Sequence, residues 1–78
     1  MAKPGNKRSL TIARHRTSVT LEDEFWTALG DLARAEGKSV AALVGEIDQK
    51  RSARPNPQPS LSAAIRLYVL ERMRGSSA

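Results

Sequence analysis

The sequence predicts a mainly α-helical fold in which a short extended stretch precedes three helices and two copies of the chain intertwine as a homodimer. The apolar pattern changes its period from two to about 3.6 at Glu22, so that a strand leads directly into a helix. A strand of about six residues with one apolar side cannot form a sheet alone, and no second strand of matching pattern is obvious in the chain. The simplest partner is the same strand of a second copy, which gives an intermolecular antiparallel β-ribbon across a two-fold axis.

The chain has 78 residues and no cysteine, which limits it to one small domain without disulfides or thiolate metal sites. Dimerisation or close helix packing must then stabilise it. No apolar run approaches the roughly 18 residues of a membrane span. The basic N-terminus lacks the apolar core of a signal peptide. We therefore expect a cytoplasmic protein that has no membrane partner and needs no cofactor.

The charge is segregated along the chain, although the net charge is only +5. Residues 1–21 carry five bases and no acid, residues 22–48 carry seven acids against two bases, and residues 49–78 carry six bases against one acid. This segregation favours a polyanion such as nucleic acid as the partner of one surface. A basic tail that only keeps the protein in solution is the alternative interpretation of the same pattern.

Two segments near the N-terminus have the pattern of strands. From Arg16 to Leu21, Thr17, Val19 and Leu21 alternate with Arg16, Ser18 and Thr20. Residues 8–13 form a second short extended segment, in which the apolar positions are even-numbered rather than odd-numbered. One straight strand would put the two apolar sets on opposite faces, so we expect a bulge or turn between Ala13 and His15.

Two helices should follow the second strand. The first runs from about Asp23 to Glu36, with Gly37 in position to end it in a left-handed cap. Its apolar stripe consists of Phe25, Leu29, Leu32 and Ala33. Trp26 lies one position to the side of this stripe. Ser39 is a good N-cap for the second helix, which should end between residues 49 and 51. The buried face of that helix consists of Val40, Leu43, Val44 and Ile47.

A third helix is expected after a connector that contains three prolines, Pro55, Pro57 and Pro59. It should run from Leu61 to Arg74, with Ser60 or Ser62 as its cap. Its apolar residues indicate packing against the first two helices or against the other copy, and they are Leu61, Ile65, Leu67, Tyr68, Val69, Leu70 and Met73. We divide the chain into a flexible basic arm (1–7), a core (8–51), a proline-rich connector (52–60), this helix (61–74) and a tail (75–78).

The order of these elements resembles the ribbon-helix-helix family of dimeric DNA-binding proteins, to which MetJ and Arc belong. The residues that carry the resemblance are RTSVTLEDEFWTALGDLARAEGKSVAALVGEI, residues 16–47. Residues 8–73 further resemble a subgroup of small bacterial proteins with this domain, through RSLTIARHRTSVTLEDEFW, SVAALVGEID and LSAAIRLYVLERM. That subgroup often has glycine where this chain has Arg14. Either Arg14 adopts a less demanding backbone conformation here, or it changes the local approach to DNA.

The resemblance implies that an antiparallel ribbon, with one strand from each copy, lies in the major groove. Arg16, Ser18 and Thr20 would then face the base edges. A two-stranded ribbon fits a groove about 12 Å wide, arginine can pair with guanine, and the hydroxyls can donate or accept. The opposite side would pack into a dimer core formed by Val19, Leu21, Phe25, Trp26, Leu29, Leu43 and Ile47. Without the resemblance, the polar side could equally be a solvated face of a half-buried strand.

Phosphate contacts are expected around the ribbon. The amides at the start of the second helix, at Ser39 and Val40, can bind a DNA phosphate, with Lys38 beside them. An ordinary serine cap would look the same in the sequence. Further phosphate contacts are expected from three more bases. They are Lys7 in the arm, Arg8 at the start of the first extended segment, and Arg14 between the two segments.

The remaining candidate residues point to no catalysis. His15 is the only histidine, and without cysteine or clustered carboxylates it makes no metal site. We expect it at a strand edge or beside Arg16 at the DNA. Phe25 and Trp26 lie on or beside an apolar stripe, which favours the core over a platform for single-stranded bases. No histidine-carboxylate pair is placed to activate a serine.

We therefore predict a homodimeric, sequence-specific double-stranded DNA-binding protein, a transcriptional regulator of the repressor or antitoxin type and not an enzyme. Such a protein would be associated with the nucleoid in the cytoplasm. In the antitoxin version, Asn56 to Ala78 could bind a protein partner, although so apolar a helix favours a place in the folded dimer. The alternative is a dimeric protein-interaction module of the same fold without specific DNA binding. A basic protein partner would suit the acidic residues on and beside the first helix. These residues are Glu22, Asp23, Glu24, Asp31 and Glu36.

Overall fold

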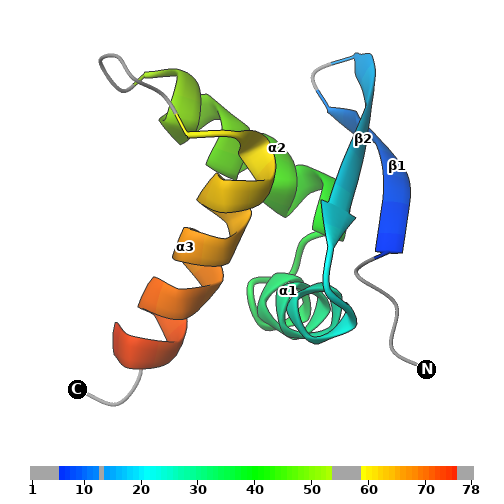
Figure 1. The fold of residues 1–78 in the computed structure, drawn as a ribbon. Helices are drawn as coiled ribbons and strands as arrows, with labels where there is room; N and C mark the ends of the chain where they lie inside the picture. The colour runs from blue at the N-terminus through cyan, green and yellow to red at the C-terminus, as the bar shows by residue number, and fades with distance from the viewer. Residues whose placement is uncertain (1–5, 13, 54–58, 76–78) are drawn as a thin grey trace.

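The computed structural model describes residues 6–12, 14–53 and 59–75. Two strands, β1 (Asn6–Ile12) and β2 (His15–Leu21), come first. They are followed by three helices, α1 (Asp23–Ala35), α2 (Val40–Ser52) and α3 (Leu61–Gly75). Figure 1 shows the two strands side by side, with the three helices together on one side of them. The predicted order of strands and helices is confirmed, and the helix boundaries agree with the expected ones to within about two residues.

The two strands form one antiparallel hairpin within a single chain, with Ile12 opposite His15 and Asn6 opposite Leu21. The sequence showed no obvious partner for residues 16–21 within the chain, yet β1 is such a partner. The intermolecular ribbon stays a prediction, because the structure of one chain does not test it. Only two residues separate β1 from β2, and one of them, Arg14, has a φ of +68°. A left-handed residue is what a tight hairpin needs, so this turn folds β1 back onto β2. The turn expected near residues 13–15 is confirmed, although Ala13 lies outside the described residues.

The hairpin also resolves the conflict between even and odd apolar positions. Residues that face each other across an antiparallel pair lie on the same side of the sheet. The register therefore puts Leu10 and Ile12 on the same side as Val19 and Leu21, against the helices. Ile12, Val19 and Leu21 are buried there. Burying an aliphatic side chain of this size contributes about 1.5–3 kcal/mol, which fixes the side of the sheet that faces the helices.

Helix α1 contributes Trp26, Leu29 and Ala33 to the core, whereas Phe25 and Leu32 are only partly buried. The buried stripe is thus centred one residue later than the sequence pattern indicated. Trp26 lies under the hairpin, and the guanidinium carbon of Arg8 lies 4.7 Å from the centre of its ring. Phe25 lies nearer the edge, with the guanidinium carbon of Arg66 5.9 Å from its ring. The Arg8 side chain of β1 lies over the Trp26 ring.

Helix α2 begins as predicted, because the Ser39 hydroxyl accepts a hydrogen bond from the Ala42 amide at 3.0 Å. Leu43, Val44 and Ile47 are buried, and Val40 packs at the edge of the core. Gly37 ends the preceding helix with a φ of +70°, the left-handed conformation that glycine adopts without strain. The tight connection between α1 and α2 follows directly from these two residues.

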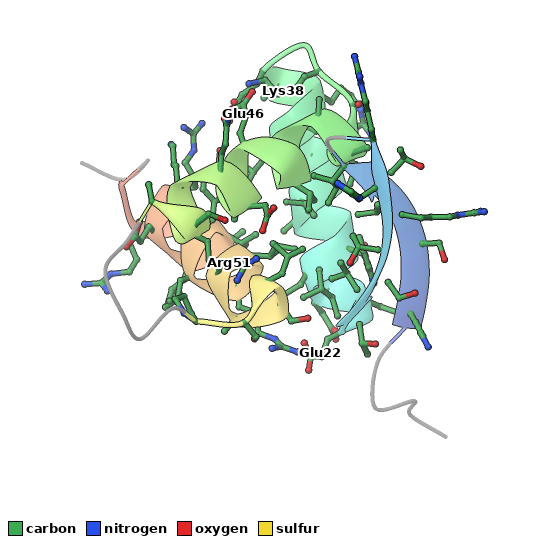
Figure 2. The ribbon with its side chains drawn as sticks, turned by 90° about the horizontal axis from the view of Figure 1, so that it is seen from above. Glu22, Lys38, Glu46 and Arg51 are labelled. Carbon is green, nitrogen blue, oxygen red and sulfur yellow. The ribbon has the colours of Figure 1, made fainter. Side chains whose placement is uncertain are left out.

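Helix α3 packs against the other elements of the same chain, and its buried residues need no second copy to cover them. Ile65 and Val69 are buried in the core, and Ser60 caps the helix by accepting from the Ala63 amide at 3.1 Å. The connector between α2 and α3 lies largely outside the described residues. Arg51 donates to the Pro59 carbonyl, on the other side of the connector, at 3.3 Å. It also donates to the Asp48 carboxylate in its own helix, at 2.6 Å. Figure 2 shows Arg51 at the opposite end of α2 from Lys38.

Three apolar residues expected on the packing side of α3 are exposed instead. Leu67 is 46% exposed, Leu70 is 50% exposed and Met73 is 62% exposed. The buried face of α3 is narrower than its composition indicated, because one chain provides only the surfaces of α1, α2 and β2 to cover it. Among the described residues, no helix is both long and apolar enough to cross a membrane.

Candidate nucleic-acid interface

The side of the hairpin that faces away from the helices is entirely polar. The register places Lys7 opposite Thr20, Ser9 opposite Ser18, and Thr11 opposite Arg16. All six side chains are exposed, and Figure 2 shows side chains projecting from the sheet on the side away from the helices. We call this surface the polar face; its residues are Lys7, Ser9, Thr11, Arg16, Ser18 and Thr20.

The polar face has the chemistry that base edges and phosphates require. It carries two cations and four hydroxyls, and all six side chains can donate hydrogen bonds. Its two neighbouring strands form a ribbon narrow enough for the major groove. The three predicted base-contacting residues, Arg16, Ser18 and Thr20, lie together on this face. Ser9 and Thr11 were missed from the sequence, because their alignment with β2 follows only from the position of the turn.

The three bases expected to reach phosphates from the N-terminal half take different positions. Lys7 belongs to the polar face, in a segment that we expected to be a flexible arm but that forms part of β1. Arg14 is exposed at the tip of the hairpin. Arg8 is opposite Val19 and therefore points to the helix side, where it stacks on Trp26. Arg8 therefore packs on the core and is not part of the polar face.

The start of α2 lies near the open edge of β1, since Thr11 and Ser39 line the same shallow hollow. The Ser39 hydroxyl accepts a hydrogen bond from the Ala42 amide, and the Leu43 amide donates to the Ser39 carbonyl at 3.0 Å. The amides of Val40 and Ala41 are not used by either bond. This geometry fits the expected phosphate site as well as it fits an ordinary helix cap.

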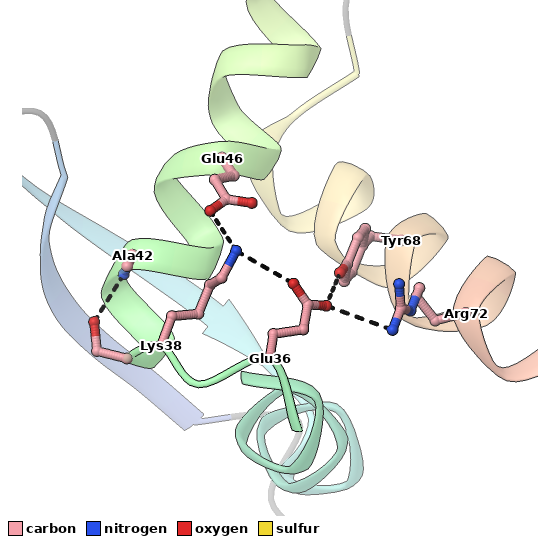
Figure 3. Close-up of polar contacts among 7 residues, drawn as sticks. Glu36, Lys38, Ala42, Glu46, Tyr68 and Arg72 are labelled. Carbon is pink, nitrogen blue, oxygen red and sulfur yellow. Dashed lines mark hydrogen bonds and ion pairs between the residues drawn. The ribbon is translucent and has the colours of Figure 1, made fainter. Parts of the chain in front are cut away.

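Lys38, expected beside that phosphate, is held within the chain. Its ammonium lies 2.5 Å from the Glu46 carboxylate and 3.3 Å from the Glu36 carboxylate (Figure 3). The hydrogen bond to Glu46, with a smaller one to Glu36, outweighs desolvation and raises the pKa of Lys38. The positive charge of Lys38 is therefore largely offset by carboxylates of its own chain.

Glu36, at the end of α1, contacts α3 directly and is linked to α2 through Lys38 and Glu46. The Tyr68 hydroxyl donates to its carboxylate at 2.8 Å, and Arg72 lies 3.5 Å away (Figure 3). The Tyr68 hydrogen bond, followed by that from Lys38, lowers the pKa of Glu36. Burial, followed by the same hydrogen bond, raises the pKa of Tyr68. At neutral pH this cluster is a charged carboxylate held by a neutral phenol and two cations.

A second polar contact ties α3 to the end of β2. Arg66 donates to both carboxylate oxygens of Glu22, at 3.0 and 3.3 Å, and this bond lowers the pKa of Glu22. Beside it, the Ser62 hydroxyl donates to the Thr20 carbonyl at 3.2 Å. That carbonyl therefore points away from β1. Carbonyls alternate in direction along a strand, so those of Arg16 and Ser18 point to the same open edge.

The residues expected in a dimer core are mostly buried within one chain. This holds for Val19, Leu21, Trp26, Leu29, Leu43 and Ile47, while Phe25 is partly buried. Their burial does not by itself require a second copy. Among the described residues, no group of three or more histidines, cysteines or carboxylates is arranged to hold a metal ion.

Comparison with known proteins gives one result that covers most of the chain. The family model described as a ribbon-helix-helix domain matches residues 5–73. This range includes both strands, all but the last two residues of α3, and every residue of the polar face. No curated protein and no solved structure gives a significant match.

Proposed function

Because this chain belongs to the ribbon-helix-helix domain family, we propose that it binds double-stranded DNA as a homodimer and regulates transcription. The family is a non-enzymatic, DNA-binding one. In this proposal the β2 residues of the polar face enter the major groove, where Arg16, Ser18 and Thr20 meet the base edges. The protein is then a sequence-specific regulator, a repressor or an antitoxin-like autorepressor.

The observation that carries this proposal is the contrast between the two sides of the hairpin. One side buries Ile12, Val19 and Leu21, and the other exposes only cationic and hydroxyl side chains. A strand that needed only a solvated outer face could carry acids there as well. The polar face has none, although the chain contains eight acidic residues. This selection of donors suits a polyanion.

The homodimer in this proposal forms at the open edge of β2. The backbone groups of Arg16 and Ser18 face that edge, and an antiparallel copy of β2 could pair with them. The bond from Ser62 to Thr20 would give way to the partner strand at the end of the pairing. One side of α3 carries Ser62 and Arg66, which contact the end of β2. The exposed Leu70 and Met73 lie further along the same side of the helix. A second copy would cover the strand edge and these apolar side chains together.

The proposal is tested by fluorescence anisotropy with random-sequence duplex DNA across a salt series. The wild-type protein should bind with steep salt dependence, since each phosphate neutralised adds about 0.9 to the slope of log K against log salt. Arg16→Ala should weaken binding at least tenfold. Arg34→Ala is the matched control, because it removes the same charge from the exposed surface of α1. Weak, flat binding by the wild type, or equal effects of the two substitutions, would contradict the proposal.

The alternative of a protein-interaction module gains no specific support. The acidic surface that favoured it is largely engaged within the chain. Glu22 is bound by Arg66, Asp31 lies 3.6 Å from Arg34, and Glu36 is bound by Tyr68. A partner through the C-terminal segment would have to use the outer side of α3, because Ile65 and Val69 are already buried.

A further inference from the structure

Strand β1 supplies half of the polar face, and only Lys7 of that half has an expected role, as a phosphate contact. Lys7, Ser9 and Thr11 lie directly opposite Thr20, Ser18 and Arg16 on the same exposed side. An ammonium and two hydroxyls in a row on one strand can all donate hydrogen bonds in the same direction. We call Lys7, Ser9 and Thr11 the β1 row.

The position of the β1 row in a dimer follows from the edge that remains open. The Thr20 carbonyl points away from β1, toward Ser62. A second copy that pairs along this edge of β2 therefore leaves both copies of β1 on the outside. The sheet would have the strand order β1-β2-β2-β1, with Arg16, Ser18 and Thr20 on its two central strands.

The width of such a four-stranded sheet implies different positions on DNA for β1 and β2. Neighbouring strands lie about 4.8 Å apart, so the outer strands of four would be about 14 Å apart. The major groove is only about 12 Å wide. The central strands can enter it, but the outer strands must lie over its walls, where the phosphates are.

We propose that the β1 row binds DNA phosphates at the two walls of the groove while the β2 residues face the bases. This inference rests on the proposed DNA binding and assigns Ser9 and Thr11 a role that the sequence pattern did not indicate. Phosphate contacts hold a protein in register on the duplex and carry no sequence information. The β1 row therefore sets the affinity and orientation of the protein rather than its choice of site.

The first arm of the test measures the salt dependence of binding to duplex DNA by anisotropy. Lys7→Gln should lower the slope of log K against log salt by about 0.9 for each contact, hence by roughly 1.8 for a dimer. Lys50→Gln is the matched control, because it removes one exposed lysine from the last turn of α2, in a different element of the molecule. Equal slopes for the two variants would overturn the inference.

The second arm measures which bases are preferred, by selection from a library of random duplexes. Thr11→Val keeps a β-branched residue in the strand and removes the hydroxyl. It should weaken binding to all duplexes alike, whereas Arg16→Ala should change the selected sequence. A changed preference in Thr11→Val would mean that β1 reads bases, and would overturn the inference while leaving DNA binding intact. A wild-type protein that binds no duplex would refute the proposed function itself.

Discussion

At the scale of single residues, Arg14 has the most demanding backbone conformation. Among the described residues it is the only one other than glycine with a positive φ, +68°. For a residue with a Cβ this conformation costs roughly 1–2 kcal/mol. The resemblance to a subgroup with glycine at this position left open whether Arg14 avoids that conformation. It does not, and the hairpin retains a strained residue whose cation is exposed at its tip.

Arg14→Gly should therefore raise the free energy of unfolding. Relief of the strained conformation is partly offset by the greater freedom of glycine in the unfolded chain, so the net gain should be about 0.5–1 kcal/mol. Arg14→Ala is the matched control, because it removes the same side chain but keeps the strain. Urea unfolding followed by circular dichroism measures both variants. Equal stabilities of the glycine and alanine variants would show that the turn is not strained.

At the scale of elements, the two faces of β2 can be separated by adjacent substitutions. Val19→Asp puts a carboxylate in the core, where Val19 is only 2% exposed. An unpaired buried charge should unfold the protein, with loss of its helical circular dichroism. Ser18→Asp puts the same carboxylate on the polar face. This variant should keep the fold but lose DNA binding, because the charge repels phosphate. A folded Val19→Asp variant would contradict the assignment of faces.

The place of α3 is tested by a second pair of substitutions. Ile65 is fully buried, whereas Leu67 is 46% exposed on the opposite side of the helix. Ile65→Ala should cost about 2–5 kcal/mol of unfolding free energy. Leu67→Ala should lower the free energy of unfolding by well under half as much. Urea unfolding distinguishes the two, and similar small effects would mean that α3 is only loosely attached to the core.

These elements differ in how far the sequence could predict them. The helix starts and ends were predictable, because Ser39 and Gly37 act through bonds and angles that are local in the chain. The partner of β2 was not, since it depends on Arg14 adopting a conformation that arginine seldom takes. The central place of Trp26 was also missed, because it depends on how β1 and Arg8 cover the ring. The exposed polar residues of β2 were predicted from alternation, but those of β1 required the register.

At the scale of the whole molecule, the segregated charges have two different roles. The acidic middle of the chain is joined to the basic C-terminal part through the Glu22–Arg66 and Glu36–Arg72 pairs. The N-terminal bases Lys7 and Arg16 instead remain on the exposed side of the sheet. The internal pairs thus offset much of the acidic charge, and the hairpin presents a positive surface.

The same pairs predict loss of stability in acid. The pKa values of Glu22 and Glu36 are lowered from 4.5 in the folded chain, mainly by the hydrogen bonds from Arg66 and Tyr68, respectively. Their contribution to stability is therefore present above about pH 4.5 and is lost as the pH falls through the lowered values. Thermal melts between pH 6 and pH 3 measure this loss. Tyr68→Phe should show a shallower loss than the wild type, and an unchanged pH profile would contradict the role of this bond.

The central claim is that the polar face of the hairpin is the surface that meets duplex DNA. Backbone amide chemical shifts of the full chain, recorded by NMR during titration with a short duplex, test it most directly. We expect the largest changes in β1 and β2, at Ser9, Thr11, Arg16 and Ser18, and small changes along the outer side of α3. The largest changes on α3 or on the acidic surface of α1, with little in the hairpin, would contradict the account.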